Sequence, residues 1–466
     1  MNIKLMIAVI AAKLAASLSR MFGGKGSSLP GVVARRIYQG TLRDLAKQAR
    51  KDIIMVTGTN GKTTTNNMIA SVIASTGCKI VINQEGANLI TGVTTAFIRY
   101  ANWLGRIDCD YALLEVDEAS FPKVLREISP QMVVVNNFFR DQLDRYGELD
   151  KTVTLVREAL KDLPQVHLIL NSDDPLVAQM QQATGHSATF FGLAPNQRPA
   201  TGSQQTREAR FCPMCGEELQ YENYQYSQLG SFVCPGCSFK RPEPEIEGFA
   251  IETVGSVLNA SVKYHQAMTT LSIHTHGFYN VYNALAAFTV GSLIGIKPEQ
   301  IAKGLLTYRP AIGRMETFFY QGKPAILNLV KNPTGYNEGV NSLLSIAGTK
   351  TVFMAINDND ADGKDISWLW DVDFEHMVKA NHEIELFVCS GLRAEEMALR
   401  LKYAGIPLEQ ITVIKEMEPA IKKALEGPGK LTYLFSTYTA LWSAQKILLA
   451  LAEKEVPHAE GVSSIS

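Results

Sequence analysis

The segment Ile53–Ser75 reads IIMVTGTNGKTTTNNMIASVIAS, which predicts a buried strand, a tight glycine loop and a helix. Gly58 and Gly61 let the backbone approach a ligand closely, so that its N–H groups can point at phosphate oxygens. A helix that begins near Thr63 adds the positive end of its dipole. The expected phosphate loop consists of Gly58, Thr59, Asn60, Gly61, Lys62, Thr63 and Thr64.

Two side chains of this loop carry the expected chemistry of an ATP site. Lys62 supplies a mobile cation for the outer phosphates, and Thr63 supplies a hydroxyl for a magnesium ion. The alternative is a chance Gly-Lys-Thr sequence in an ordinary turn, but a strand before it and a helix after it argue against that reading. Val56 stands where the longer pattern has its first glycine, so the loop is a variant of that pattern.

A carboxylate is expected beside the loop. Glu115 ends the predicted strand Tyr111–Glu115, and the carboxyl end of a parallel strand next to a phosphate loop is a suitable place to hold magnesium. The alternative for Glu115 is a solvated acidic turn. We therefore expect Thr63 and Glu115 as magnesium ligands, with Lys62 and Glu115 as catalytic residues.

The composition indicates a packed protein of more than one domain. The chain has 466 residues, of which 46% are apolar and 20% are charged, so two or three domains are expected. Its formal net charge is −1, and the sequence has no basic stripe of the kind that binds nucleic acid. No nucleic-acid partner is expected.

Residues 1–48 are expected to form an N-terminal helical segment. Its apolar stretch Leu5–Ala16 is interrupted by Lys13 and is shorter than the ~18 apolar residues of a spanning helix. An apolar run after Lys4 is also typical of a cleaved signal peptide. An amphipathic helix that docks on the protein body or on a membrane surface fits equally well. The nucleotide site and the cysteine usage favour the cytoplasm, with the inner face of the membrane as an option.

Short apolar runs alternate with helical stretches from Asp52 onward, which predicts an α/β protein with a parallel, doubly wound sheet. Residues 49–312 are expected to form the ATP-binding central domain. A break rich in Pro, Gln, Gly and Thr introduces a module inserted at 205–245. Further alternating strands and helices predict a Rossmann-like domain at 313–452, and 453–466 is expected to be a frayed tail.

The inserted module contains two C-x2-C turns separated by eighteen residues: Cys212, Cys215, Cys234 and Cys237. Four thiolates from two such turns close a tetrahedral site, which is the geometry of structural zinc. An iron–sulfur cluster and paired disulfides are the alternatives. A structural site has all four positions filled, so no catalytic role is expected for it.

Five motifs occur in the order that they have in Mur ligases, and the chain resembles that family over most of residues 50–440. The motifs are GTNGKTTT (58–65), LLEVDE (113–118), NNFFRDQLDRYG (136–147), NSDDP (171–175) and NVYNALAA (280–287). Mur ligases use ATP to activate a carboxylate as an acyl phosphate, which an amine then attacks. The resemblance implies that Asn283 contacts the adenine and that Arg314 meets the nucleotide from the C-terminal domain.

Within the family, the chain is most similar to synthetase subunits that amidate a lipid-linked peptidoglycan precursor with ammonia from a separate GatD-type glutaminase. The four-cysteine insertion and the segments Asp141–Asp144 and Asp362–Trp368 carry this similarity. It implies a heterodimer in which Asp365 orients a histidine of the glutaminase, since a carboxylate beside an imidazole fixes its tautomer.

Two departures from the amino-acid-adding members point the same way. Gln142 and Arg157 stand where those enzymes have a histidine and a carbamoylated lysine, so a second magnesium site is expected to be altered or absent. Lys331-Asn332-Pro333 replaces their usual Asp-x-x-His-Asn-Pro, which suits ammonia better than a bulky amino acid.

The acidic segment Asp358–Gly363 has the first half of a calcium loop, but Leu369 stands where that loop needs its bidentate glutamate. A solvated turn is the plain alternative. Three functions therefore stay open. The leading one is a partner-dependent amidotransferase synthetase that uses ATP and Mg²⁺, with structural Zn²⁺. The others are a self-sufficient amino-acid ligase of the folylpolyglutamate type and a non-catalytic ATP-binding scaffold for a glutaminase.

Overall fold

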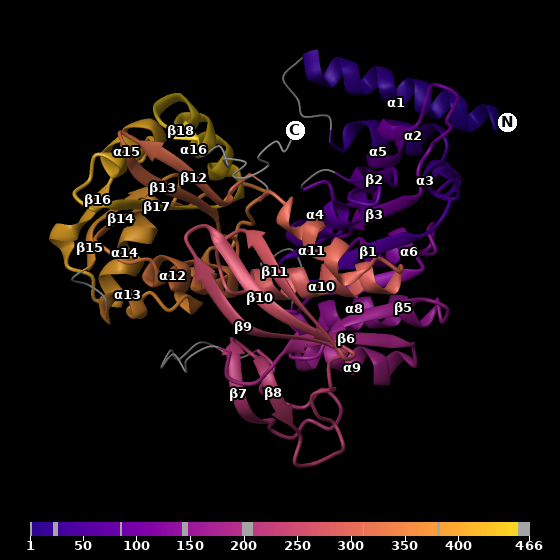
Figure 1. Ribbon diagram of the computed structural model, residues 1–466. Helices are drawn as coiled ribbons and strands as arrows, with labels where there is room; N and C mark the ends of the chain where they lie inside the picture. The colour runs from indigo at the N-terminus through magenta and orange to yellow at the C-terminus, as the bar shows by residue number, and fades with distance from the viewer. Residues whose placement is uncertain are drawn as a thin grey trace, which may run out of the picture. The chain divides into compact units, whose positions relative to one another are not determined.

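The computed structural model describes residues 2–21, 27–83, 86–141, 148–197, 208–310, 312–379 and 383–454. The chain divides into two compact units, the first ending at Arg309 and the second beginning at Pro310 (Figure 1). Both are α/β, which confirms the predicted fold class. The domain limits 49–312 and 313–452 stay predictions.

The first unit is built on a nine-stranded sheet of order β11-β10-β9-β6-β5-β4-β1-β3-β2. Its strands are β1 (Ile53–Thr57), β2 (Ile80–Ile82), β3 (Tyr111–Glu115), β4 (Met132–Val135), β5 (His167–Asn171), β6 (Ala188–Leu193), β9 (Ile246–Val254), β10 (Val257–Tyr264) and β11 (Ala267–His274). The pairs from β2 to β9 are parallel. The last three strands form an antiparallel meander at one edge.

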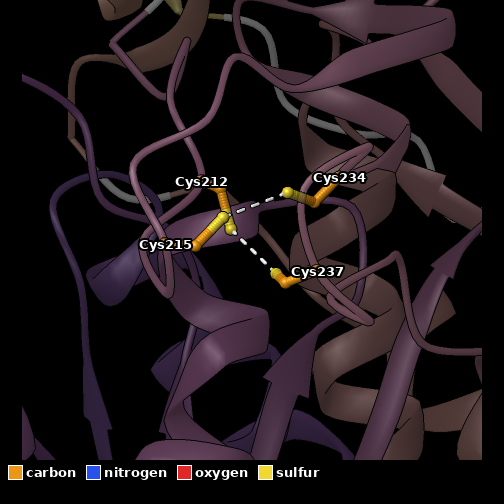
Figure 2. A group of neighbouring side chains, drawn as sticks. All are labelled: Cys212, Cys215, Cys234 and Cys237. Carbon is orange, nitrogen blue, oxygen red and sulfur yellow. Dashed lines mark hydrogen bonds between the residues drawn. The ribbon is translucent and has the colours of Figure 1, made fainter.

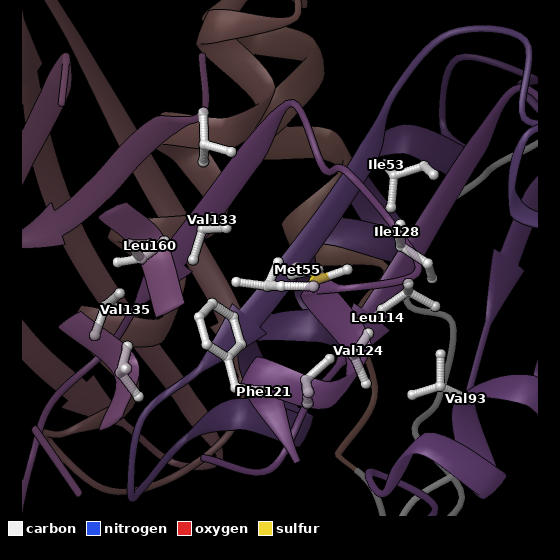
Figure 3. Packing of buried hydrophobic residues seen from close by; sticks show 14 of the residues in the cluster. Ile53, Met55, Val93, Leu114, Phe121, Val124, Ile128, Val133, Val135 and Leu160 are labelled. Atoms are coloured by element: carbon white, nitrogen blue, oxygen red, sulfur yellow. The ribbon is translucent and has the colours of Figure 1, made fainter. Parts of the chain in front are cut away.

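Helices cover both faces of this sheet, as a parallel sheet requires. The described helices of this unit are α1 (Ile3–Met21), which packs on α2 and α5, and α2 (Leu29–Ile37), α3 (Thr41–Ala46), α4 (Lys62–Ala74), α5 (Ile90–Tyr100), α6 (Phe121–Leu125), α8 (Leu149–Lys161), α9 (Pro175–Thr184), α10 (Asn280–Leu293) and α11 (Pro298–Leu306). Strand β1 shows how the faces are divided, because alternate side chains point to opposite sides. Met55 packs into the core drawn in Figure 3, together with Leu114 and Phe121. Val56 packs into the other core, against α4 and α10.

The second unit is a seven-stranded sheet of order β16-β15-β14-β17-β13-β12-β18. Its strands are β12 (Arg314–Tyr320), β13 (Lys323–Leu329), β14 (Lys350–Ala355), β15 (Ile384–Ser390), β16 (Ile411–Val413), β17 (Leu431–Ser436) and β18 (Glu453–Lys454). Its helices are α12 (Pro333–Ser345), η1 (Ser367–Asp371), α13 (Glu375–Lys379), α14 (Ala394–Ala404), η3 (Leu408–Gln410), α15 (Met417–Leu425) and α16 (Tyr438–Leu451). The five strands from β16 to β13 pair in parallel.

Candidate active site

The phosphate loop connects β1 to α4, and two glycines make its path possible. Gly58 has a φ of 114°, and a Cβ on it would lie 2.8 Å from the carbonyl oxygen of Asn137. Gly61 has a φ of 82°, and a Cβ on it would lie 2.2 Å from Oδ1 of Asn283. A side chain at either position would collide with these asparagines, so both positions require glycine, and the tight loop that results is of the kind that turns backbone N–H groups toward a phosphate.

Asparagines after β4 hold the loop in shape. The backbone N–H of Asn60 donates to Oδ1 of Asn137 at 2.8 Å, and Nδ2 of Asn136 donates to Oγ1 of Thr65 at 3.0 Å. Thr65 also donates to Oδ1 of Asn283 at 3.1 Å. Asn283 therefore lies against the phosphate loop. Its expected contact with adenine stays a prediction.

Lys62 lies in a strongly acidic setting. It is only 6% exposed, and its Nζ donates to the carbonyl of Gly58 at 2.6 Å and to Oε1 of Glu118 at 3.0 Å. Burial lowers the pKa of Lys62, but the charges of Glu118, Asp117 and Glu115 outweigh it and raise that pKa above its usual value. The ammonium is thus a fixed cation at the start of the helix.

Thr63 and Glu115 come together as the magnesium hypothesis requires. Oγ1 of Thr63 donates to Oε2 of Glu115 at 2.8 Å, and Nδ2 of Asn88 donates to Oε1 of Glu115 at 3.2 Å. Asn83 holds the end of β3 by accepting from the backbone N–H of Glu115 and donating to its carbonyl. A hydroxyl beside a carboxylate is an oxygen donor set that suits Mg²⁺.

Several residues of this site could not be predicted from the sequence. Glu118 is the partner of Lys62, while Asn88, Asn136 and Asn137 hold Glu115 and the loop. All but Asn88 lie within the motifs quoted from the sequence, yet neutral amides and a third acidic residue carry no spacing signal of their own. Gln142 lies outside the described residues.

The four cysteine thiols gather in one place (Figure 2). Sγ of Cys212 lies 3.7 Å from Sγ of Cys237, and Sγ of Cys215 lies 3.4 Å from Sγ of Cys234. All four sulfur atoms lie within 4.8 Å of one another. Four thiolates around one zinc ion stand about 3.8 Å apart, so the cluster fits zinc. The hairpin of β7 (Gln220–Tyr226) and β8 (Leu229–Val233) lies between the two cysteine turns.

The turn of this hairpin contacts the residues that support the phosphate loop. Gln228 is fully buried, and its Nε2 donates to the carbonyl of Phe138 at 2.6 Å. The next residue, Phe139, exchanges two hydrogen bonds with the side chain of Thr59, at 3.0 and 3.1 Å. The ring of Phe139 lies 6.0 Å from that of Tyr226. The cysteine module therefore supports the phosphate loop through two neighbouring residues.

A second link joins the module to the helix that carries Asn283. Asp173 accepts from Nε of Arg241 at 2.7 Å and from the hydroxyl of Tyr282 at 2.6 Å. It is 1% exposed, so this buried carboxylate ties the end of the module to α10. Burial, followed by the charge of Asp173, raises the pKa of Tyr282 well above its usual value, so the phenol keeps the proton that it donates.

The remaining predicted residues belong to the second unit. Arg314 is the first residue of β12 and is half-buried. Oδ1 of Asp365 accepts from the backbone N–H of Ser367 at 2.8 Å, at the start of η1. Asn332 is 1% exposed and caps α12 by accepting from Gly335 at 2.8 Å. The roles expected for Arg314 and Asp365 stay predictions.

The acidic segment is held by protein donors. Asp358 pairs with Arg393 at 2.6 Å, Asp360 pairs with Lys364 at 3.1 Å, and Asp362 accepts from the backbone N–H of Thr439 at 2.7 Å. These contacts explain the segment as a structural turn between β14 and η1. Of the nearby tryptophans, Trp368 is buried while Trp370 is 55% exposed.

Comparison with known proteins agrees with this geometry. Residues 56–233 match the family described as "Mur ligase middle domain", and residues 329–441 match "MurT ligase C-terminal". A Staphylococcus aureus protein named "Lipid II isoglutaminyl synthase (glutamine-hydrolyzing) subunit MurT" is 38% identical, over 93% of this chain and 95% of that protein. A Streptococcus pneumoniae protein of the same name is 32% identical, over 96% of this chain and 98% of that one.

A solved structure supports the fold. A pseudomurein peptide ligase type C from Methanothermus fervidus has a TM-score of 0.67 and 23% identity, covering 87% of this chain and 80% of that chain. Together with the phosphate loop and Glu115, these matches define an ATP-dependent ligase. The chain belongs to the Mur ligase family and, within it, to the MurT ligases. Among the described residues, none of the helices is long and apolar enough to cross a membrane.

Proposed function

We propose that this chain is the synthetase subunit that amidates the α-carboxylate of D-glutamate in the lipid II stem peptide to D-isoglutamine. The observation that carries the proposal is the meeting of Lys62, Thr63 and Glu115 at one edge of the sheet, in a chain that aligns along almost its whole length with subunits of that name. The protein works in the cytoplasm, at the inner face of the membrane where a lipid-linked acceptor lies.

The reaction has two steps. First, an oxygen of the acceptor carboxylate attacks the γ-phosphorus of ATP and ADP leaves, which forms an acyl phosphate. Ammonia then attacks the carbonyl carbon and loses a proton, and phosphate leaves with the former carboxylate oxygen. Lys62 balances charge on the outer phosphates, and the loop N–H groups orient them. Thr63 and Glu115 would hold Mg²⁺, which would screen the phosphate charge when bound.

Ammonia comes from glutamine hydrolysed by a GatD-type glutaminase that pairs with this chain. The described residues support this in one respect. Cys389, the single cysteine of the second unit, lies within β15 and is fully buried, and burial raises the pKa of its thiol to about 12. Such a thiol is protonated at neutral pH and cannot act as a glutaminase nucleophile. We therefore assign this activity to a separate subunit and not to Cys389.

The test supplies the chain with ATP, Mg²⁺, a muramyl-peptide lipid labelled with ¹⁸O in the α-carboxylate, and either ammonium or an amino acid. Amide formation with ammonium, and transfer of one ¹⁸O atom to inorganic phosphate, are expected. Product formation only with an amino acid would favour the folylpolyglutamate-type ligase. No turnover with ammonium, with or without the glutaminase, would favour a scaffold and refute the proposal.

A further inference from the structure

Helix α1 is apolar on two opposite faces. Its inner face buries Leu5, Ala8, Val9 and Ala12 in the core of the first unit. Its outer face carries five large apolar side chains that are 49% to 80% exposed: Ile3, Ile7, Leu14, Leu18 and Met21. At 100° per residue, these five positions fall within about 60° of one another, opposite the buried stripe. A helix with apolar side chains on two opposite faces can pack against two apolar partners.

The five exposed apolar residues form a stripe along the outer face, and the charge around this outer stripe is of one sign. The first 43 residues contain seven basic residues and no Asp or Glu, although the whole chain has a net charge of −1. Lys4 flanks the stripe on one side, and Lys13 and Arg20 flank it on the other. Among the ion pairs of the described residues, none involves these three cations. The outer face therefore complements a surface that is apolar inside and anionic outside.

Two further residues extend this face. Trp103 is 56% exposed and lies beside α1, with Nζ of Lys13 5.6 Å from the centre of its ring. Arg99, whose pKa is lowered by burial and then by the charge of Arg20, adds a further basic residue on α5. An exposed tryptophan next to basic residues is typical of the headgroup region of a bilayer.

Helices α1 and α2 are attached to helix α5, which begins next to the active site of the first unit. The backbone N–H of Gly31 in α2 donates to Oγ1 of Thr95 at 2.9 Å. A Cβ on Gly31 would lie only 1.9 Å from the carbonyl oxygen of Thr91, so α2 and α5 are in backbone contact. Helix α5 begins two residues after Asn88, which contacts Glu115. A surface that binds α1 is therefore held at a fixed place relative to Glu115.

We propose that the outer face of α1 docks on an anionic membrane surface, with the stripe Ile3–Met21 among the upper acyl chains and Lys4, Lys13 and Arg20 among the phosphate headgroups. The docking itself follows from the helix. Its purpose rests on the proposed function, because a lipid-anchored acceptor lies at that same surface. Docking brings the phosphate loop to the acceptor and leaves the acceptor's lipid in the bilayer.

The experiment uses the full chain in complex with its glutaminase and vesicles of equal parts phosphatidylglycerol and phosphatidylcholine. The variant Ile7→Gln/Leu14→Gln/Leu18→Gln keeps helix-forming residues and removes the stripe. We expect it to lose at least tenfold in vesicle affinity. The matched control is Val254→Gln/Met268→Gln, which replaces two apolar residues that are 61% and 68% exposed on the meander. It is expected to bind vesicles as the parent does.

Activity measurements with two acceptors distinguish a loss of membrane docking from a loss of catalysis. Amidation of an acceptor embedded in vesicles is expected to fall about as much as vesicle binding, while a water-soluble acceptor without the lipid is amidated at the parent rate. Lys4→Glu/Lys13→Glu/Arg20→Glu is expected to weaken binding to anionic vesicles far more than to neutral ones.

Three outcomes would overturn the docking. One is equal vesicle binding by the parent and the Gln variant. Another is a dimer that only the parent forms, which would make a second copy the occupant of the face. The third is loss of the glutaminase subunit from the variant, which would make that subunit the occupant. Normal vesicle binding without amidation of either acceptor would instead refute the proposed function alone.

Discussion

At the scale of single residues, the site consists of buried polar groups that hold one another. Glu115 accepts from Thr63 and Asn88, while Lys62 donates to Glu118 and to the carbonyl of Gly58. Each of these contacts replaces hydration that burial removes, and a buried charge that loses its partner is costly. We therefore expect each substitution in this site to impair one step of the reaction, so that the role of each residue can be tested separately.

Glu115→Gln tests the magnesium role. The amide keeps the shape of the side chain but removes the charge that is proposed to bind the cation. We expect the half-saturating Mg²⁺ concentration for ATP turnover to rise roughly 10- to 100-fold. Glu158→Gln is the control, because this carboxylate is exposed on α8. An unchanged Mg²⁺ requirement would show that Glu115 has a structural role only.

Asp365→Asn tests the coupling to the glutaminase. If Asp365 orients a histidine of the partner, glutamine-driven amidation and glutaminase turnover stop, while ATP binding and ammonium-driven amidation remain. Asp360→Asn is the matched control, since Asp360 has an almost fully exposed side chain in the same segment. Full glutaminase activity in the Asp365→Asn complex would contradict the expected role.

At the scale of elements, the β7–β8 hairpin links the cysteine cluster to the phosphate loop. The link runs from Gln228 to Phe138 and from Phe139 to Thr59. A metal ion held by the four cysteines at the base of the hairpin would thus set the position of a turn that supports the phosphate loop. The module would thereby serve the ligase through its contacts, without a catalytic role for its thiols.

Gln228→Leu breaks this link and leaves the carbonyl of Phe138 buried without its donor, which costs about 1–3 kcal/mol. We expect the KM for ATP to rise several-fold with kcat and zinc content little changed. Glu222→Gln, at an exposed position on the same hairpin, serves as the control. A fall in kcat at unchanged KM would argue against a positioning role for Gln228.

Removal of the metal is expected to act through the same link. Cys212→Ser should abolish the one zinc ion per chain that metal analysis of the parent would find, lower the melting temperature, and raise the KM for ATP. Because both changes act on one contact path, Cys212→Ser/Gln228→Leu should raise KM no more than the single variant with the larger effect. Additive effects would show two independent paths.

At the scale of the whole molecule, the chain consists of two contact units with separate sheets and cores. The phosphate loop, Glu115 and Asn283 belong to the first unit, whereas Arg314 and Asp365 belong to the second. Two units with separate cores need not unfold in one step. The unfolding transition that a nucleotide shifts therefore identifies the unit that binds it.

Calorimetry with Mg-ADP provides that probe. A ligand at 100 times its Kd stabilises the unit that binds it by about 2.7 kcal/mol. We expect the transition that Cys212→Ser lowers to move up in temperature, because it belongs to the first unit. If Arg314 also meets the nucleotide, the other transition moves as well, and Arg314→Ala abolishes that second shift. A shift of the second transition alone would contradict the placement of the site.

Much of this protein follows from sequence alone, because the relevant signals are local. Short apolar runs before glycine loops predict strands that lead into helices, and the spacing of Cys212, Cys215, Cys234 and Cys237 predicts their cluster. The meeting of Thr63 with Glu115 also follows, since the carboxyl ends of adjacent parallel strands share one edge. These features depend on neighbours in the chain or on a general rule of sheet topology.

Other features were decided by the tertiary structure. Glu118 pairs with Lys62 over 56 positions of chain, Gln228 reaches Phe138 over 90, and Tyr282 reaches Asp173 over 109. Sequence spacing carries no signal for such pairs, because they form only when packing brings two buried polar groups together and each must find a partner. The outer face of α1 is another feature that only the tertiary structure decided. Its apolar residues are visible in the sequence, but only the packed helix separates those that the protein buries from those that it leaves exposed.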